Sequence, residues 1–208
     1  MEYYFAPFGC IGVFGCSSSG KSTLVQKMLR YADKIFAPPL FKEIYYFSGS
    51  KYRPSFEGVK QKVHYVRGIP SLEVLEDINN SAIVLDDSLE SLLCNANSAS
   101  FISTRLAHHN NNLIIILLQE LFIPKLRIML NNLNAYIFLK NDRWTSKFQC
   151  FARQCAGSQA SELIAFIRDC HKVNWGYVVI DFSPQLPSKY RYRSTLFPFL
   201  EDLELLIL

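Results

Sequence analysis

The chain has 208 residues, a mass of 23.9 kDa and a formal net charge of +4. Apolar residues make up 50% and charged residues 19%, a balance that supplies a large core and excludes an intrinsically disordered chain. The length suits one domain, so we expect residues 1–208 to form a single unit, and the mild basicity permits a polyanionic partner without requiring one.

Apolar runs alternate with amphipathic stretches along the whole chain. We expect strands at residues 10–14, 43–47, 63–66, 82–85, 113–118, 135–139 and 177–181. We expect helices at residues 24–32, 71–77, 89–106 (one helix or two), 123–133 and 159–171. Fully apolar strands separated by helices are typical of a mainly parallel sheet covered on both faces, so the predicted fold class is α/β. The proline-punctuated tail, about 184–208, shows no assignable pattern.

Neither a membrane span nor a secretion signal is visible. The longest aliphatic run, Leu113 to Leu118, is far shorter than the roughly 18 residues that a spanning helix needs. Glu2 and the lack of basic residues before the first apolar stretch do not fit a signal peptide. The six cysteines form no C-x-x-C pair, which favours free thiols. We therefore expect a protein of a reducing compartment that is not secreted and binds no membrane.

A phosphate-binding motif follows the first predicted strand. Residues 15–22 read GCSSSGKS and fit G-x-x-x-x-G-K-[ST], with an amphipathic helix directly after them. The two glycines let backbone N–H groups surround a phosphate chain, and the helix start adds positive potential. Lys21 would carry the charge for the β- and γ-phosphates, and Ser22 would bind Mg²⁺. We expect ATP to be held by Gly15, Cys16, Ser17, Ser18, Ser19, Gly20, Lys21, Ser22 and Thr23.

Polar residues end two further strands. Asp86 and Asp87 follow the strand at 82–85. We expect Asp86 to hold Mg²⁺ together with Ser22, and Asp87 to orient or deprotonate the attacking water. Gln119 ends the strand at 113–118, where it could sense the γ-phosphate or position water. If that strand lies between those of the P-loop and Asp86, the fold is RecA-like; spacing alone does not decide this.

Several segments together resemble the FtsK/HerA superfamily, and more narrowly the poxvirus-type DNA-packaging ATPases of large DNA viruses, virophages and Polinton or adintovirus-like elements. They occur in the family's order over nearly the whole chain: FGCSSSGKST, YYFSGSKYRPSFE, VRGIPSLEVLED, AIVLDDS, TRLAHHNNNLIIILLQELF, LNNLNAYIFLKNDR, FARQ, NWGYVVIDFSP and YRYRSTLFP. The chain departs from the family at Asp87, where many relatives have Glu, and at Asp142, where we expect proline.

The resemblance implies a P-loop NTPase with a RecA-like core and an additional central strand. It implies a homo-oligomeric ring, expected to be a hexamer, that hydrolyses ATP with Mg²⁺ to move double-stranded DNA into a capsid. The implied partners are DNA, bound without sequence preference, and a capsid or portal-vertex protein. The implied location is the host cytoplasm or nucleus, at sites of virion assembly, with association to the virion. By resemblance, Lys21 and Ser22 serve phosphate and metal, Asp86 and Asp87 are the Walker B acids, and Gln119 is the strand-end sensor.

A ring ATPase commonly completes its site with an arginine from the neighbouring subunit. The candidates are Arg105, Arg127, Arg143 and Arg153, of which we favour Arg127 and Arg143 because they flank the strand after the sensor strand. His108 and His109 could read the γ-phosphate or line the subunit interface. A basic cluster, Lys189, Arg191 and Arg193, could contact DNA phosphates.

Two other functions are compatible with the same sequence. A P-loop nucleotide or nucleoside kinase would suit the length, although the Asp-Asp and Gln strand ends fit an ATPase better. A non-motor ATP-dependent switch in virion assembly would share the motor's site. DNA-stimulated hydrolysis separates the motor from both, and phosphorylation of a small acceptor identifies the kinase.

Overall fold

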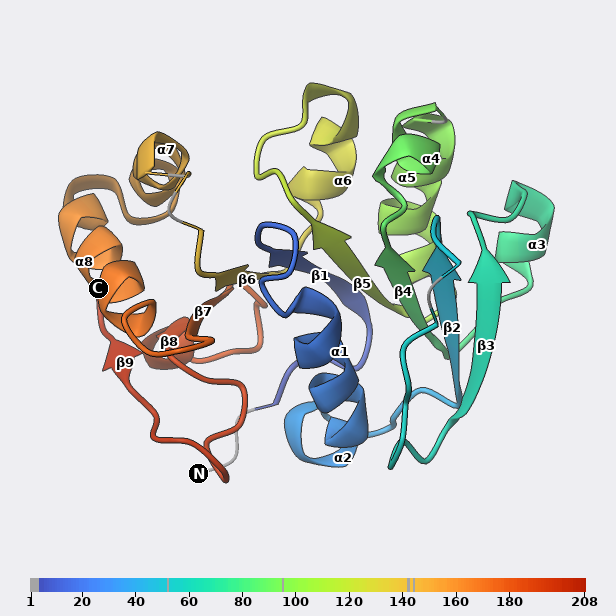
Figure 1. The fold of residues 1–208 in the computed structure, drawn as a ribbon, viewed down its shortest axis with the longest axis horizontal. Helices are drawn as coiled ribbons and strands as arrows, with labels where there is room; N and C mark the ends of the chain where they lie inside the picture. Colours follow the sequence, from blue (N-terminus) through green and yellow to red (C-terminus); the bar gives the residue numbers. More distant parts are fainter. Residues whose placement is uncertain (1–3, 52, 95, 142, 144) are drawn as a thin grey trace.

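The strands form one mixed sheet. The computed structural model describes residues 4–51, 53–94, 96–141, 143 and 145–208. The sheet of these residues has nine strands, in the order β3-β2-β4-β5-β1-β6-β7-β8-β9 (Figure 1). In chain order they are β1 (Gly9–Phe14), β2 (Glu43–Ser48), β3 (Lys62–Arg67), β4 (Ala82–Asp86), β5 (Leu113–Leu118), β6 (Ala135–Leu139), β7 (Tyr177–Asp181), β8 (Tyr192–Arg193) and β9 (Leu205–Leu206). The first six strands in the sheet order, β3, β2, β4, β5, β1 and β6, pair in parallel. Strands β7, β8 and β9 each pair antiparallel to the strand before them, so the structure confirms the mainly parallel α/β fold.

Helices lie between most of the successive strands, and two of the helices were not expected from the sequence. They are α1 (Lys21–Arg30), α2 (Ala32–Ile35), α3 (Leu72–Glu76), α4 (Leu89–Cys94), α5 (Ala96–Phe101), α6 (Arg127–Asn131), α7 (Thr145–Ala156) and α8 (Ala160–Cys170). A π-helical turn, Ile102–Leu106, continues α5, and a 3₁₀ turn, Pro124–Leu126, precedes α6. The sequence prediction missed α2 and α7.

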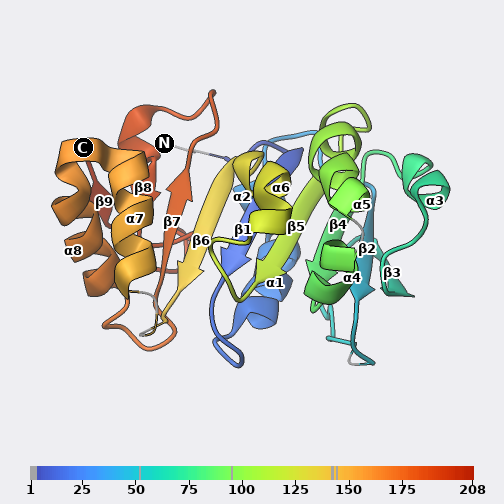
Figure 2. The ribbon, with the colours of Figure 1, turned by 90° about the horizontal axis from the view of Figure 1, so that it is seen from above.

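The sheet separates two apolar cores. Along β5, Ile114, Ile116 and Leu118 face the core beneath α4 to α8, while Ile115 and Leu117 face the core beneath α1 and α2. Figure 2 shows the two helical layers on opposite faces. Successive side chains of a strand point to opposite faces, so a strand buried on both must be apolar throughout. Each such side chain stabilises the fold by about 1.5–3 kcal/mol relative to exposure.

The strand order decides the question that spacing left open. β5 pairs with β1 on one side and with β4 on the other, both in parallel register. The strand that ends in Gln119 therefore lies between the P-loop strand and the Asp86 strand. This is the additional-strand, RecA-like arrangement.

The tail is built into the sheet, and this corrects one expectation. Arg193 lies on β8 with a fully buried side chain, and its guanidinium donates to Asp181 Oδ2 at 3.1 Å and to the carbonyl of Tyr190 at 2.7 Å. A buried charge of this kind is stable only with such partners. Arg193 is therefore a structural residue and cannot contact DNA, unlike the exposed Lys189 of the same cluster.

Candidate active site

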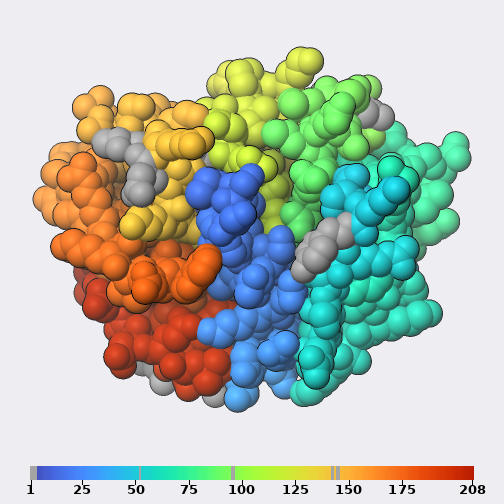
Figure 3. Space-filling view, viewed as in Figure 1, coloured from blue at the N-terminus to red at the C-terminus, as the bar shows by residue number. Residues whose placement is uncertain are grey.

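The P-loop lies in a cleft at the carboxyl ends of the central strands. Residues 15–20 connect β1 to α1. Asp86 ends β4, Asp87 follows it, and Gln119 follows the neighbouring strand β5. The cleft has a volume of about 600 Å³ and is lined by residues 17–23, Asp86, Asp87, Gln119 and three apolar side chains. In Figure 3 the N-terminal part of the chain, which contains the P-loop and is coloured blue, crosses the middle of the face. It lies between the C-terminal third of the chain and residues 40–65. The parallel sheet thus brings together the acid and amide predicted to act on phosphate.

The backbone of the loop has the shape that a phosphate cradle requires. Gly20 has a φ of 93° and Ser18 a φ of 60°, both in the left-handed region. A Cβ on Gly15 would lie 2.4 Å from the Ser19 hydroxyl oxygen, so a side chain there would collide with the loop. The Gly15 N–H donates to the Leu118 carbonyl at 3.1 Å, which fixes the start of the loop to β5. The turn is held in place before any phosphate enters it.

Lys21 points back into this loop. Its Nζ donates to the carbonyl oxygens of Gly15 at 2.8 Å and Cys16 at 2.7 Å. Burial lowers the pKa of Lys21, while the negative charges of Asp86 and Asp87 act in the opposite direction. The lysine therefore sits inside the P-loop with two acids nearby, where it can transfer its hydrogen bonds from carbonyl oxygens to phosphate oxygens.

Ser22 and Asp86 form the oxygen pair that a divalent cation needs. The Ser22 hydroxyl donates to Asp86 Oδ2 at 2.8 Å, so the first turn of α1 and the end of β4 are in direct contact. The Tyr46 hydroxyl, from β2, donates to the same carboxylate oxygen. A serine oxygen and one carboxylate fit Mg²⁺, which takes few protein ligands and completes its shell with phosphate and water oxygens. Among the described residues no group of three or more His, Cys, Asp and Glu side chains could hold a metal.

Asp87 and Gln119 flank the open part of the cleft. Asp87 is exposed and has a φ of 48°, a left-handed conformation that Asp tolerates better than most residues. A Cβ on Gly49 would lie only 2.2 Å from the Asp87 carbonyl oxygen, so the loop after β2 presses against Asp87. Gln119 lies beside the loop, with Oε1 3.5 Å from the Ser17 hydroxyl. Both side chains line the cleft that contains the P-loop.

Comparison with known proteins now supports the fold. No protein-family model matches the sequence, and neither does any curated protein. A solved structure of the genome packaging NTPase B204 from Sulfolobus turreted icosahedral virus 2, in complex with AMPPCP, aligns with a TM-score of 0.53 and 12% identity, over 86% of this chain and 95% of the other. B204, the DNA-packaging ATPase from Sulfolobus turreted icosahedral virus, aligns with a TM-score of 0.50 and 12% identity, over 86% and 94%. The chain has the fold of a P-loop NTPase.

The four candidate arginines of this P-loop NTPase fold lie in different places. Arg143 lines an open groove together with Asp87, Gln119 and Ser17, so it is close to the site of its own subunit. Arg127 is exposed at the start of α6 and lines none of the described pockets near the P-loop. Arg105 forms a surface ion pair with Glu76 at 3.6 Å.

Arg153, the fourth candidate, is exposed on α7. Asp142, the residue before Arg143 that departs from the family pattern, lies outside the described residues.

His108 and His109 do not reach the nucleotide site of their own subunit. His108 ends the helical stretch and His109 begins the turn before β5, at the amino end of a strand whose carboxyl end is followed by Gln119. The same turn supplies Asn112, which accepts from the Ser81 N–H at 2.8 Å and donates to the carbonyls of Ile78 and Leu106. The His-His-Asn block thus joins the loops that enter β4 and β5. A role of the two histidines at a subunit interface stays a prediction.

Trp175 is a site residue that the sequence reasoning did not identify. A Cβ on Gly20 would lie 3.4 Å from its indole ring, which is 74% exposed and lines the P-loop cleft. Its φ of 61° is strained for a tryptophan. The next residue must be glycine, because a Cβ on Gly176 would lie 2.0 Å from the Cys170 carbonyl oxygen. The turn between α8 and β7 therefore holds a flat aromatic surface against the end of the phosphate loop, a placement that no local motif encodes.

Within the described part of the chain, no helix is both long and apolar enough to cross a bilayer.

Proposed function

We propose that the chain is an ATP-hydrolysing motor of the FtsK/HerA type that moves double-stranded DNA into a viral capsid. The observation that carries this proposal is the meeting of Lys21, the Ser22–Asp86 pair and Gln119 at the carboxyl ends of three adjacent strands, β1, β5 and β4, with β5 in the middle. This arrangement suits hydrolysis of a nucleoside triphosphate. Support for packaging comes from the sequence resemblance and from the similar fold of B204, whose solved structures are described as a genome packaging NTPase and DNA-packaging ATPase.

Each side chain has a distinct part in the proposed reaction. Lys21 binds the β- and γ-phosphates with its ammonium group, and the loop N–H groups hold the phosphate chain. Ser22 and Asp86 would hold Mg²⁺, which would neutralise phosphate charge when bound. Asp87 orients the attacking water and accepts its proton, and Gln119 holds that water against the γ-phosphate. Trp175 offers the face on which the adenine base stacks.

The assembly belongs to the same proposal. A homo-oligomeric ring, a hexamer by resemblance, would place an arginine of one subunit, Arg127 or Arg143, at the γ-phosphate of the next. The ring would act on DNA without sequence preference and dock on a capsid or portal-vertex protein, at virion assembly sites in the host cell.

The test is the ATPase rate with and without long double-stranded DNA, at two salt concentrations. We expect strong stimulation that weakens as salt rises, because contacts to the phosphate backbone release counterions. Lys21→Ala should abolish hydrolysis in both conditions, and Lys172→Ala, a surface lysine paired with Asp169, is the matched control. A rate indifferent to DNA, with phosphate transferred to a small acceptor, would replace the motor by a kinase.

A further inference from the structure

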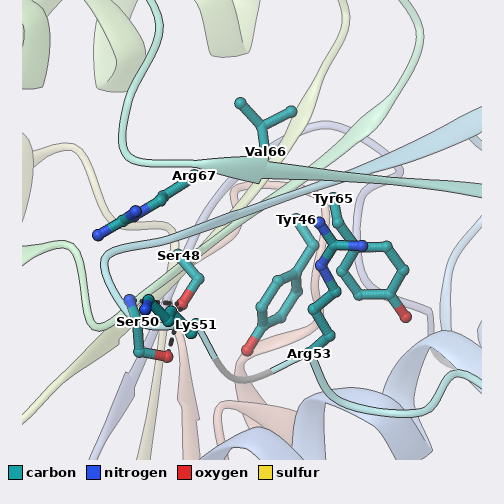
Figure 4. Close-up of a pocket in the computed structure, with 8 residues that line it drawn as sticks. All are labelled: Tyr46, Ser48, Ser50, Lys51, Arg53, Tyr65, Val66 and Arg67. Carbon is teal, nitrogen blue, oxygen red and sulfur yellow. Dashed lines mark hydrogen bonds between the residues drawn. The ribbon is translucent and has the colours of Figure 1, made fainter.

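A small basic pocket opens at the carboxyl ends of β2 and β3, outside the nucleotide cleft. It has a volume of about 160 Å³, far less than the cleft at the P-loop. Figure 4 draws its lining, with Arg53 and the rings of Tyr46 and Tyr65 on one side and Lys51 and Arg67 on the other. The size suits a single small group rather than a whole nucleotide.

The charge of the pocket is entirely positive. Lys51, Arg53 and Arg67 are exposed, and the described lining contains no acid. In the part of the chain that the structure describes, none of these three cations forms an ion pair. Three unneutralised cations around one cavity repel one another, and a bound anion relieves that repulsion. Guanidinium groups together with serine hydroxyls are the donors that suit phosphate oxygens.

One of the three cations, Arg53, is held in place by the aromatic wall. The Arg53 guanidinium lies 5.6 Å from the centroid of the Tyr65 ring, a cation–π contact. The Tyr65 hydroxyl donates to the Pro54 carbonyl at 2.7 Å, which ties the loop that carries Arg53 to β3. Arg67 ends β3 itself. The pocket is therefore preorganised by one strand end and one anchored loop.

The pocket touches the metal-binding acid through one side chain. Tyr46 lines the pocket with its ring, 6.0 Å between centroids from Tyr65, and its hydroxyl donates to Asp86. The backbone makes a second connection between the loop after β2 and Asp86, since the Gly49 N–H donates to the Asp86 carbonyl at 3.3 Å. A group that shifts the pocket wall therefore acts on the carboxylate that also binds Ser22.

We infer that this pocket binds a backbone phosphate of double-stranded DNA and that Tyr46 couples its occupancy to the geometry of Asp86. The inference rests on the proposed function, because it takes DNA as the partner. It adds where DNA is sensed and how that contact reaches the hydrolytic site. Since a phosphate group carries no base identity, the contact is independent of sequence.

The first experiment measures binding of a fluorescent DNA duplex over a range of salt concentrations. The double variant Arg53→Gln/Arg67→Gln should reduce the slope of log K against log salt by about one, since the pocket holds one phosphate and each lost phosphate contact lowers the slope by about one. The matched control, Arg153→Gln/Arg168→Gln, removes two exposed arginines of α7 and α8 and should leave the slope near that of the wild type. Arg53→Lys/Arg67→Lys should restore most of the slope because charge is retained. Thermal unfolding of all variants identifies any loss of fold.

The second experiment separates coupling from binding. Tyr46→Phe should keep the DNA affinity within about twofold of the wild type, because the phosphate contacts are intact. The ratio of DNA-stimulated to unstimulated hydrolysis should fall toward one. A Tyr46→Phe variant with the wild-type ratio would overturn the coupling.

The outcomes distinguish this inference from the function on which it rests. If wild-type protein neither binds DNA nor responds to it, both fall. If wild-type protein binds DNA and is stimulated, yet Arg53→Gln/Arg67→Gln keeps the wild-type slope, the pocket assignment alone is overturned. Binding of inorganic phosphate is measured as well. If the pocket binds free phosphate at millimolar concentration and the double variant binds DNA as the wild type does, the pocket is a site for product phosphate instead.

Discussion

The hydroxyl of Ser22 donates a 2.8 Å hydrogen bond to Oδ2 of Asp86, although the two residues are on different elements and far apart in the sequence. This contact joins the start of α1 to the end of β4 and makes one oxygen pair from two motifs. The Tyr46 hydroxyl bonds to the same carboxylate oxygen, so Asp86 is held from two sides. The oxygen pair that we propose to bind Mg²⁺ is thus positioned by the protein itself.

Ser22→Ala should weaken Mg²⁺-dependent ATP binding and hydrolysis. The change removes one expected metal ligand and one hydrogen bond to a charged group, a loss of about 1.5–3 kcal/mol or roughly 10- to 100-fold. The measurement is the Mg²⁺ concentration for half-maximal hydrolysis, which should rise by that factor. Ser91→Ala, on the adjacent α4, is a control that leaves the oxygen pair intact. An unchanged Mg²⁺ requirement in Ser22→Ala would contradict the assignment.

Asp87→Asn should bind ATP and hydrolyse it slowly. The amide keeps the shape of the side chain but cannot accept a proton from water, so the rate should fall by about 10²- to 10⁴-fold, the usual contribution of a general base. ATP binding is measured separately with a fluorescent analogue. Loss of binding instead of turnover would assign Asp87 to the metal.

Gly49→Ala should disturb the same residue by a steric route. The new Cβ would lie 2.2 Å from the Asp87 carbonyl oxygen, so the backbone must shift, at a cost of about 1–3 kcal/mol. We expect lower stability and slower hydrolysis together. Gly157→Ala is the matched control. An alanine at this position is strained by the φ of 55°, but its Cβ would have no atom within 4 Å, and residue 157 does not line the cleft. This variant should lose stability and keep the wild-type rate per folded molecule.

The local features were predictable from sequence, while their relations in space were not. The apolar runs that became β4 and β5 and the P-loop are continuous in the sequence. The position of β5 between β1 and β4 is a pairing between distant segments and leaves no periodic signal. Helix α7 has an amphipathic pattern, with Phe148, Phe151 and Ala152 buried at helical spacing, so a signal for it was present. The place of Trp175 beside the P-loop and the basic pocket between β2, β3 and the loop after β2 both depend on segments that meet only in the folded chain.

Trp175→Ala should raise the KM for ATP by about tenfold. Stacking of a base on an aromatic ring contributes about 1–3 kcal/mol, and Phe at this position should retain much of it. Val173→Ala, an exposed apolar residue of the same turn, is the control. Trp175→Gly should bind ATP as poorly as the alanine variant yet unfold at a higher temperature, because glycine accepts the φ of 61° without strain. A wild-type KM in both variants would remove Trp175 from the site.

Glu201→Gln should lower the melting temperature at neutral pH. Burial alone would raise the pKa of Glu201, but hydrogen bonds from Lys27 and Thr195 outweigh it and lower the pKa. A lowered native pKa adds stability above the unfolded value and loses it as the pH falls through the native pKa. The ion pair between Glu201 and Lys27 is partly exposed, so we expect Glu201→Gln to lower the free energy of unfolding by about 1 kcal/mol and the melting temperature by roughly 2–4 °C.

The pH profile is the decisive part of that measurement. The difference in melting temperature between wild type and Glu201→Gln should shrink as the pH falls from the ordinary glutamate pKa, about 4.3, through the lowered native pKa, because the folded wild-type carboxylate becomes protonated there. Asp202→Asn, the adjacent acid, should show no such trend. A gap independent of pH would mean that Glu201 acts through packing alone.

Subunit mixing tests which arginine acts on a neighbour. Arg143 lies in the groove with Asp87 and Gln119 of its own chain, whereas Arg127 is exposed on α6 and away from that chain's cleft. An arginine that serves only the next subunit must be remote from its own site, so the geometry favours Arg127 for the role in trans. Arg127→Ala should poison wild-type subunits, so that activity falls more steeply than the mutant fraction. Arg143→Ala should reduce activity in proportion to that fraction, because its groove belongs to its own subunit. The reverse pattern would exchange the two roles, and proportional loss in both would argue against a shared site.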